Sequence, residues 1–468
     1  MFRIPRSDTS GLMISSIDDN GVSRRNFIAG SAATVAAGTA LSPELLQAKA
    51  LGDREVKIAL IGCGGRGTGA TVQALSTYGK VRLWAMADAF EPNLMKSYRS
   101  LSAGGNYSQS KGAEAPADKV SVPEERRFVG LDAYRKVMAM PEIDMVILTT
   151  PPGFRARQFE EAVAAGKHVF MEKPVATDVH GVRTVLAAAK EAKRKNLKVG
   201  VGLNRRHSPM YEATLDRIHA GDIGRLNTIR IYNVRGGVGK FYERQPEDTE
   251  MEYQVKHWYY FDWLSGDFLV EQSVHDYDVA LWMKGMLPIN AQGQGGRLVR
   301  TGTKWGNIYD HFYVEYDFPD GSKLLSQHRH IRGCWGLFGE SADGSKGTAS
   351  LVGKSRAMVQ MHDQPNNAAW RIKETGNSYQ IEHDRLFRAI REDTPHNEAE
   401  YGAHASYAAI LGRMAAYTGK MLDWEETLKS DHRITPAGEL WSSPAPVNPL
   451  PEGGYPIDKA GMPPRIRA

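Results

Sequence analysis

A glycine-rich turn near residue 62 has the spacing of a phosphate-binding loop. It fits the pattern G-x-G-x-x-G, with a strand-like run (56–61) before it and a helix-compatible segment (70–77) after it. Glycines permit a tight turn and a close approach of the main chain to a pyrophosphate, whose charge the following helix N-terminus stabilises. We therefore predict that the turn binds a nicotinamide dinucleotide. The predicted contacts are Gly62, Gly64, Gly65, Arg66 and Gly67.

One acidic residue predicts which dinucleotide binds. Asp88 ends the second strand-like run (81–87), 21 residues after Gly67. A carboxylate at this position accepts hydrogen bonds from the ribose hydroxyls and repels a 2′-phosphate, which favours NAD over NADP. NADP stays an alternative because Arg66 is able to pair with a 2′-phosphate.

A second group able to do chemistry ends the strand-like run 168–171. Glu172, Lys173 and Pro174 follow this run directly, and in open α/β sheets the carboxyl ends of the strands are where ligands bind. The proline predicts an irregular exit from the strand, for which a cis peptide bond is one solution. Taken alone, such a triplet is more often only a charged strand end.

Four stretches together resemble the Gfo/Idh/MocA family, which includes glucose–fructose oxidoreductase and inositol dehydrogenase. They lie between about residues 55 and 285, and a fifth stretch (400–420) extends the resemblance. The resemblance implies an NAD(P)-dependent oxidoreductase that acts on a CH–OH group of a sugar or cyclitol, and a homo-oligomer. The four stretches are IGCGGRG, AGKHVFMEKP, GLNRRHSPMY and GDFLVEQSVHDYDVALWM.

The resemblance also implies a catalytic set. The family motif D-x-x-x-H-x-x-D stands here as Glu271, His275 and Asp278, at spacings that share one face of a helix. Family members mostly carry aspartate where Glu271 stands, and the extra methylene is expected to reshape the substrate pocket. The implied catalytic residues are Lys173, His275 and Glu271.

These residue types suit hydride transfer. An alcohol that loses hydride must also lose its hydroxyl proton, and a neutral imidazole at His275 accepts that proton. The ammonium of Lys173 stabilises the developing alkoxide. Glu271 or Asp278 then orients the imidazole, while C4 of the nicotinamide exchanges the hydride.

Further contacts follow from the resemblance alone. They lie at the ends of two strands and in the segment that follows the last strand of the first domain. No metal site is predicted. Arg155 stands where many family members have histidine, so it receives no role. The remaining cofactor contacts are Thr150, Pro151, Glu172, Lys173 and Asn204, and the substrate contacts are Arg206, Tyr211 and Asp278.

These side chains need two different sheets to position them. Up to residue 203, strand-like runs alternate with helical ones, which predicts an α/β fold with a doubly wound parallel Rossmann sheet. Beyond residue 204, strands follow one another, which predicts an α+β second domain with a mostly antiparallel open sheet. The predicted divisions are 1–50 (signal), 51–203 (Rossmann domain), 204–435 (substrate and oligomerisation domain) and 436–468 (proline-rich tail).

The expected elements follow the same patterns. A polar stretch, 102–125, is expected to be a surface loop. Helices are expected at 132–140, 158–165, 178–194, 209–219 and 406–417. Strands are expected at 127–130, 143–150, 168–171, 198–203, 225–234, 311–318 and 323–331.

Composition excludes several other classes of protein. The chain has 468 residues and a formal net charge of +5, with no long basic run, so a nucleic-acid partner is not expected. It has two cysteines, and Cys63 lies inside the glycine turn, which excludes a disulfide framework.

The N-terminus resembles a twin-arginine export signal. Arg24 and Arg25 stand in the run SRRNFI, ahead of a weakly apolar stretch (28–41) too short to span a membrane and a small-x-small cleavage site at 48–50. The alternative is a disordered basic terminus. We expect recognition by the twin-arginine machinery and a periplasmic or otherwise exported protein. No apolar stretch of spanning length follows, so stable membrane insertion is not expected.

Two other functions remain open from the sequence. Some relatives are glycosidases that oxidise, eliminate and re-reduce their substrate, with NAD returned unchanged. A binding protein on a retired dehydrogenase scaffold is the other alternative, against which intact Lys173 and His275 argue. Because no cofactor pool is expected outside the cytoplasm, we also expect the exported protein to keep its NAD bound through each cycle.

Overall fold

The computed structural model describes residues 52–106, 114–239, 241–353, 355–436, 438 and 441–462. The predicted twin-arginine segment lies outside the described residues. Within those ranges, no helix is both long and apolar enough to cross a membrane.

The first sheet carries the glycine turn. In the described part of the chain it has six strands in the order β5-β2-β1-β6-β7-β8, each parallel to its neighbours. The central strands are nearly continuous apolar runs because helices cover both faces. The strands are β1 (Val56–Ile61), β2 (Val81–Asp88), β5 (Arg127–Val129), β6 (Met145–Leu148), β7 (His168–Met171) and β8 (Val199–Val201). The helices are α1 (Gly65–Leu75), α2 (Glu91–Ser102), α3 (Ala133–Met138), α4 (Pro152–Ala164) and α5 (Val179–Arg194).

The second sheet is larger and mostly antiparallel. Over the described residues its order is β16-β15-β14-β13-β9-β12-β11-β10-β17, and only β9 and β12 pair in parallel. The predicted fold class, a Rossmann domain followed by an α+β domain with an open sheet, is therefore confirmed. The strands are β9 (Leu226–Arg235), β10 (Asn290–Gly296), β11 (His311–Asp317), β12 (Lys323–His330), β13 (Leu337–Gly344), β14 (Gly347–Val352), β15 (Arg356–Met361), β16 (Trp370–Lys373) and β17 (Leu422–Asp423).

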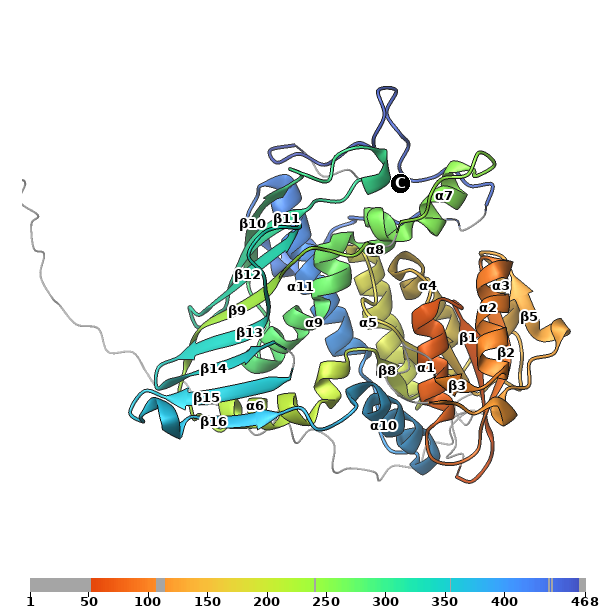
Figure 1. The fold of residues 1–468 in the computed structure, drawn as a ribbon, viewed down its shortest axis with the longest axis horizontal. Helices are drawn as coiled ribbons and strands as arrows, with labels where there is room; N and C mark the ends of the chain where they lie inside the picture. The colour runs from red at the N-terminus through yellow and green to blue at the C-terminus, as the bar shows by residue number, and fades with distance from the viewer. Residues whose placement is uncertain are drawn as a thin grey trace, which may run out of the picture. The chain divides into compact units, whose positions relative to one another are not determined.

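Two long helices pack on the second sheet. Both α9 (Asp267–Lys284) and α11 (Ala399–Thr418) are buried over most of their circumference, and in Figure 1 they lie between the second sheet and α5. A helix that is buried on several sides is usually apolar almost all round, as α11 is, whereas α9 also buries Asp267, Glu271, Asp276 and Asp278. One apolar cluster accordingly continues from the first sheet through α5, α9 and α11 to the second sheet.

Several helices begin earlier than their apolar patterns predict. Helix α1 begins at Gly65, α4 at Pro152 and α11 at Ala399. Their first turns consist mostly of glycine, proline, alanine and charged residues, and the single aromatic residues Phe154 in α4 and Tyr401 in α11 do not make an apolar period. The stretch 102–125, expected to be a loop, contains two short strands, β3 (Gly105–Asn106) and β4 (Glu114–Ala115), and short 3₁₀ turns.

The C-terminal third returns to the first sheet. Helix α10 (Ser378–Glu392) buries Leu386, Phe387 and Ile390 in the same apolar cluster as β1 and α1. Within 204–435, therefore, one helix completes the packing of the Rossmann domain. The remaining described helices are α6 (Pro209–His219), α7 (Glu250–Lys256), α8 (Asp262–Ser265) and α12 (Trp424–Lys429).

Candidate active site

The three glycines at the G-x-G-x-x-G positions of the turn have different surroundings. Gly62 has φ +94°, and a Cβ there would lie 2.6 Å from the main chain of Thr149. A Cβ on Gly67 would lie 2.0 Å from the carbonyl oxygen of Gly62 and 2.5 Å from Thr149 Oγ1. A Cβ on Gly64 would meet no atom within 4 Å. The outer two glycines therefore allow the turn to form, whereas Gly64 leaves its main chain accessible.

This turn fits a dinucleotide pyrophosphate. Gly64 is the N-cap of α1, and no side chain caps that end of the helix. The first N–H groups of a helix need acceptors, and a phosphate supplies them together with the charge that the helix dipole favours. The main chain around Gly64 and Gly65 would hold the pyrophosphate.

Asp88 is fixed at the end of β2, next to the turn. Its carboxylate accepts hydrogen bonds from the main-chain N–H groups of Cys63 (2.6 Å) and Phe90 (2.8 Å). Burial raises the pKa of Asp88, although these two hydrogen bonds oppose the shift. The carboxylate thus ties the glycine turn to the start of the next loop, where a ribose would lie.

We expect NAD to bind more tightly than NADP because a 2′-phosphate would meet the Asp88 carboxylate. The measurement is a titration of apo-protein with each dinucleotide. The replacement Asp88→Ser should reduce the ratio of NAD affinity to NADP affinity by about tenfold, which is the usual contribution of one charge contact. Equal or tighter NADP binding by the unaltered protein would contradict this assignment.

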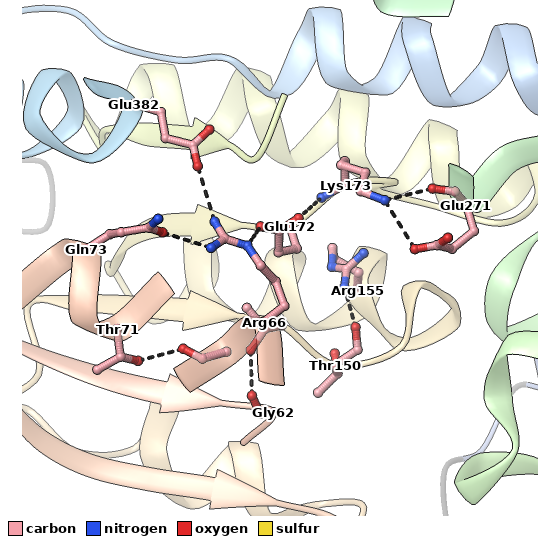
Figure 2. Close-up of polar contacts among 12 residues, drawn as sticks. Gly62, Arg66, Thr71, Gln73, Thr150, Arg155, Glu172, Lys173, Glu271 and Glu382 are labelled. Carbon is pink, nitrogen blue, oxygen red and sulfur yellow. Dashed lines mark hydrogen bonds and ion pairs between the residues drawn. The ribbon is translucent and has the colours of Figure 1, made fainter. Parts of the chain in front are cut away.

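Arg66 is predicted to contact the cofactor, but its guanidinium has three partners inside the protein. Its guanidinium donates to Glu172, to Gln73 (2.8 Å) and to Glu382 (3.3 Å), as Figure 2 shows. It also lies 5.0 Å from the ring centre of Tyr379. With all three nitrogens engaged inside the protein, Arg66 is not available to a 2′-phosphate. The alternative that rested on it, a preference for NADP, loses its support.

Glu172 and Lys173 diverge at the end of β7. Glu172 turns to Arg66, and although burial raises the pKa of Glu172, Arg66 and Lys173 together hold it below its usual value. The ammonium of Lys173 turns the other way and donates to the carbonyl oxygen of Glu271 (2.8 Å) and to Glu271 Oε1 (3.1 Å) (Figure 2). The Lys173–Pro174 peptide bond is cis.

Helix α9 brings the predicted motif to Lys173. Glu271 contacts the lysine, and His275 lies half-buried one turn further along the same face. Asp278 is buried and accepts from Arg206 at 2.9 and 3.0 Å. The structure therefore brings Lys173 and Glu271 into contact, while the carboxylate of Asp278 is committed to another partner.

The three predicted substrate contacts have partners inside the protein, and they stay predictions. Arg206 and Asp278 form a buried ion pair, and the guanidinium of Arg206 stacks 4.0 Å from the ring centre of Tyr401. Tyr211 is buried and donates to Glu340 at 3.0 Å. The ion pair holds η6 (Asn204–His207) against α9, and the hydrogen bond of Tyr211 links α6 to β13.

The other predicted cofactor contacts lie along the same strand ends. Thr150 Oγ1 donates to Gln158 at 2.6 Å, and Pro151 is the N-cap of α4. Asn204 follows β8 and donates to Ser378 Oγ at 2.8 Å. These residues stay predictions as cofactor contacts.

Sequence reasoning missed two structural supports of the site. Arg155 is buried and donates to the carbonyl oxygens of Thr150 and Pro174, so it joins the ends of β6 and β7. Burial lowers the pKa of Arg155 to about 10. Its position four residues after Pro151 was the available signal. No spacing connects Glu382 with Arg66, 316 residues earlier.

The comparisons with known proteins now bear on this geometry. Residues 56–201 match the family model described as an oxidoreductase family with an NAD-binding Rossmann fold. Over these residues the chain is similar to the Gfo/Idh/MocA oxidoreductase family. The prediction of an NAD-binding oxidoreductase domain is thereby confirmed.

Relatives extend the likeness beyond this domain. Inositol 2-dehydrogenase of Rhizobium meliloti is 26% identical over 189 residues, which are 40% of this chain and 51% of the relative. The matched segment thus spans about half the length of that relative. Among solved structures, aldose–aldose oxidoreductase from Caulobacter crescentus aligns with a TM-score of 0.60 at 18% identity, over 79% of this chain and 100% of that one. A levoglucosan dehydrogenase in complex with NADH and levoglucosan aligns with a TM-score of 0.58 at 16% identity, over 79% and 99%. The structural matches show a shared fold.

Proposed function

We propose that this protein is an NAD-dependent oxidoreductase that transfers hydride between its cofactor and a CH–OH group of a sugar or cyclitol. The observation that carries the proposal is the contact of Lys173, at the end of β7, with Glu271 on the helix that also carries His275. The names of the relatives, which act on inositol, aldoses or levoglucosan, support a polyhydroxylated substrate.

The residues of this chain have distinct tasks in such a reaction. When bound, NAD accepts a hydride from the substrate carbon. Lys173 donates a charge-assisted hydrogen bond to the substrate oxygen and stabilises its negative charge. His275 takes the hydroxyl proton. Glu271 holds the Lys173 ammonium through two oxygens and so fixes its direction.

Absorbance at the reduced nicotinamide band tests the proposal. Purified protein is screened with inositols, aldoses and 1,6-anhydro sugars, with and without added NAD. Formation of NADH on a free polyol or sugar supports an oxidoreductase. Release of a sugar from a glycoside without net NADH would favour the glycosidase alternative, and neither result with any substrate would contradict the proposal.

The proposal includes export with the cofactor held inside the folded protein. The twin-arginine-like run predicts export of folded cargo, and the C-terminal segment supports retention of the cofactor. This segment packs against residues next to Asp88: the ring of Trp441 lies 5.2 Å from that of Phe90. Lys256 of α7 lies 5.5 Å from the centre of the same ring.

The segment 441–462 is attached at several further points, and we call it the C-terminal strap. Tyr455 donates to Glu250 at 2.7 Å and packs edge-on against Phe261. Val447 is buried, and its carbonyl oxygen accepts a hydrogen bond from Gln254. These contacts hold Trp441 over the loop that follows Asp88, so the strap would slow the departure of an adenosine bound there.

We expect the Trp441→Ala variant to release NAD about two- to tenfold faster than the unaltered protein, because one aromatic contact usually contributes that much. The measurement is the loss of bound dinucleotide per chain during dialysis. Trp335→Ala is the control, because Trp335 is 64% exposed on a turn. Protein from the exported fraction should release close to one dinucleotide per chain when denatured. Release rates equal to the control would contradict a retaining role for the strap.

A further inference from the structure

Four side chains near Glu271 have no task in the reaction proposed above. Arg235 ends β9 and His330 ends β12, and the two residues are paired in the parallel ladder. Arg300 lies in the loop after β10, and Tyr259 lies in the 3₁₀ turn Trp258–Tyr260. Both arginines are electrostatic neighbours of Tyr259 and of His330, so the four lie together. We call them the Arg300 cluster.

The guanidinium of Arg300 is buried and forms no ion pair within the described residues, although Asp310 and Asp267 are electrostatic neighbours and the ring centre of Trp305 lies 4.7 Å away. Arg300 is 5% exposed, and one terminal nitrogen donates to the carbonyl oxygen of Gly236 at 3.2 Å. The other terminal nitrogen has no hydrogen-bond partner among the described residues. Within the same residues, neither Arg300 nor Arg235 forms an ion pair. Buried charges in proteins are ordinarily paired, so this arrangement calls for an anion.

The place of Arg300 depends on a glycine. A Cβ on Gly237 would lie 1.9 Å from a terminal nitrogen of Arg300 and 3.0 Å from the Cβ of His330. Gly237 has φ +80°, a conformation that side chains disfavour. The chain thus makes room for the guanidinium inside the protein rather than letting it reach the surface.

The other members of the cluster add hydrogen-bonding capacity. Tyr259 is 5% exposed, and its hydroxyl has no partner in the described part of the chain. Burial raises the pKa of Tyr259, so its hydroxyl stays a donor at neutral pH. His330 is fully buried, and neither of its ring nitrogens has a partner there. Two guanidinium groups and a phenol together make a donor-rich site.

The cluster is connected to the reacting groups by direct contacts. Arg235 donates to Gln272, and Gln272 donates to Glu271. Glu271 in turn receives the ammonium of Lys173, and it is an electrostatic neighbour of Tyr259. A group bound by the cluster would therefore belong to the same substrate molecule that meets Lys173.

We propose that the Arg300 cluster binds an anionic group of the substrate, which makes the substrate a sugar acid, such as a uronic acid, rather than a neutral sugar. The planar fork of arginine matches the two oxygens of a carboxylate. A sugar phosphate presents the same charge, and the experiment below separates the two sources. This inference rests on the proposed function because it names the substrate of that site.

Calorimetric titration of the NAD-loaded protein tests the inference without requiring turnover. The probes are D-glucuronate, D-glucose and D-glucose 6-phosphate. We expect D-glucuronate to bind at least tenfold more tightly than D-glucose, the worth of one charge-assisted contact. Arg300→Gln and Arg235→Gln should each remove most of that difference. Arg230→Gln, which removes an arginine from the opposite face of β9, should leave it unchanged.

The outcomes distinguish this inference from the proposed function. Equal affinities for D-glucuronate and D-glucose would overturn the inference. It would also be overturned if both Arg300→Gln and Arg235→Gln kept the full preference for D-glucuronate. Tightest binding of the phosphate, with D-glucuronate no better than D-glucose, would overturn the carboxylate assignment. Should Arg300→Gln fail to fold, Arg235→Gln and the comparison of probes on the unaltered protein decide the question. Binding of the acid without NADH formation on any substrate would contradict the proposed function and leave the subsite supported.

Discussion

Replacement Lys173→Ala is expected to lower kcat by about a hundred- to a thousandfold, the usual effect of removing one group that stabilises a developing oxyanion. The ammonium of Lys173 faces Glu271 and not the glycine turn, so bound NAD should stay close to one per chain. The measurement combines initial rates with dinucleotide content after denaturation. A parallel variant, His275→Ala, should show a comparable loss because it removes the proton acceptor.

Lys190→Ala is the control for the loss of a lysine. Lys190 lies on the exposed side of α5, so its removal should change neither kcat nor cofactor content. Near-normal turnover in Lys173→Ala would contradict the catalytic assignment. Loss of cofactor together with activity would instead assign Lys173 to NAD binding. Thermal melting of each variant separates both results from a folding defect.

The Rossmann half was predictable because its signals are local. A buried strand, a glycine turn and a helix follow one another within about twenty residues, and the carboxyl ends of parallel strands meet at one edge. The contact of Lys173 with Glu271 joins residues 98 positions apart. No period in the sequence connects them, so only the family motif pointed to that contact.

Other features left no readable pattern. Strand β13 reads LFGESADG, which lacks apolar alternation because its neighbours in a wide sheet decide its place. The position of α10 on the first sheet depends on packing across most of the chain. The position of the Arg66 side chain also depends on residues far away in the sequence. The glycine motif predicted that Arg66 contacts a phosphate, whereas in the structure it binds Glu172 and Glu382.

The Arg300 cluster could not be predicted from the sequence. Arg235, Arg300 and His330 lie on three separate segments, and each one alone reads as an ordinary surface charge or a core histidine. The burial of Arg300 and His330 and the register between β9 and β12 bring the three residues together. Function in the second domain therefore depends on tertiary placement, whereas function in the first depends on a contiguous motif.

Gly64→Ala and Gly67→Ala should separate binding from folding within that motif. A methyl on Gly64 meets no protein atom within 4 Å, and its φ of −71° suits alanine. Apo-protein carrying Gly64→Ala should melt at the temperature of the unaltered chain. Because the methyl stands where a pyrophosphate must approach the main chain, NAD affinity should fall about ten- to hundredfold.

Gly67→Ala should act on the fold itself. Its methyl would lie 2.0 Å from the carbonyl oxygen of Gly62, so the turn must move, at a cost of about 1–3 kcal/mol or more in unfolding free energy. Denaturant unfolding of the apo-variants and dinucleotide titration measure the two effects. Unchanged NAD affinity in Gly64→Ala would show that the pyrophosphate does not approach this turn, and the assignment of the loop as the cofactor cradle would fail.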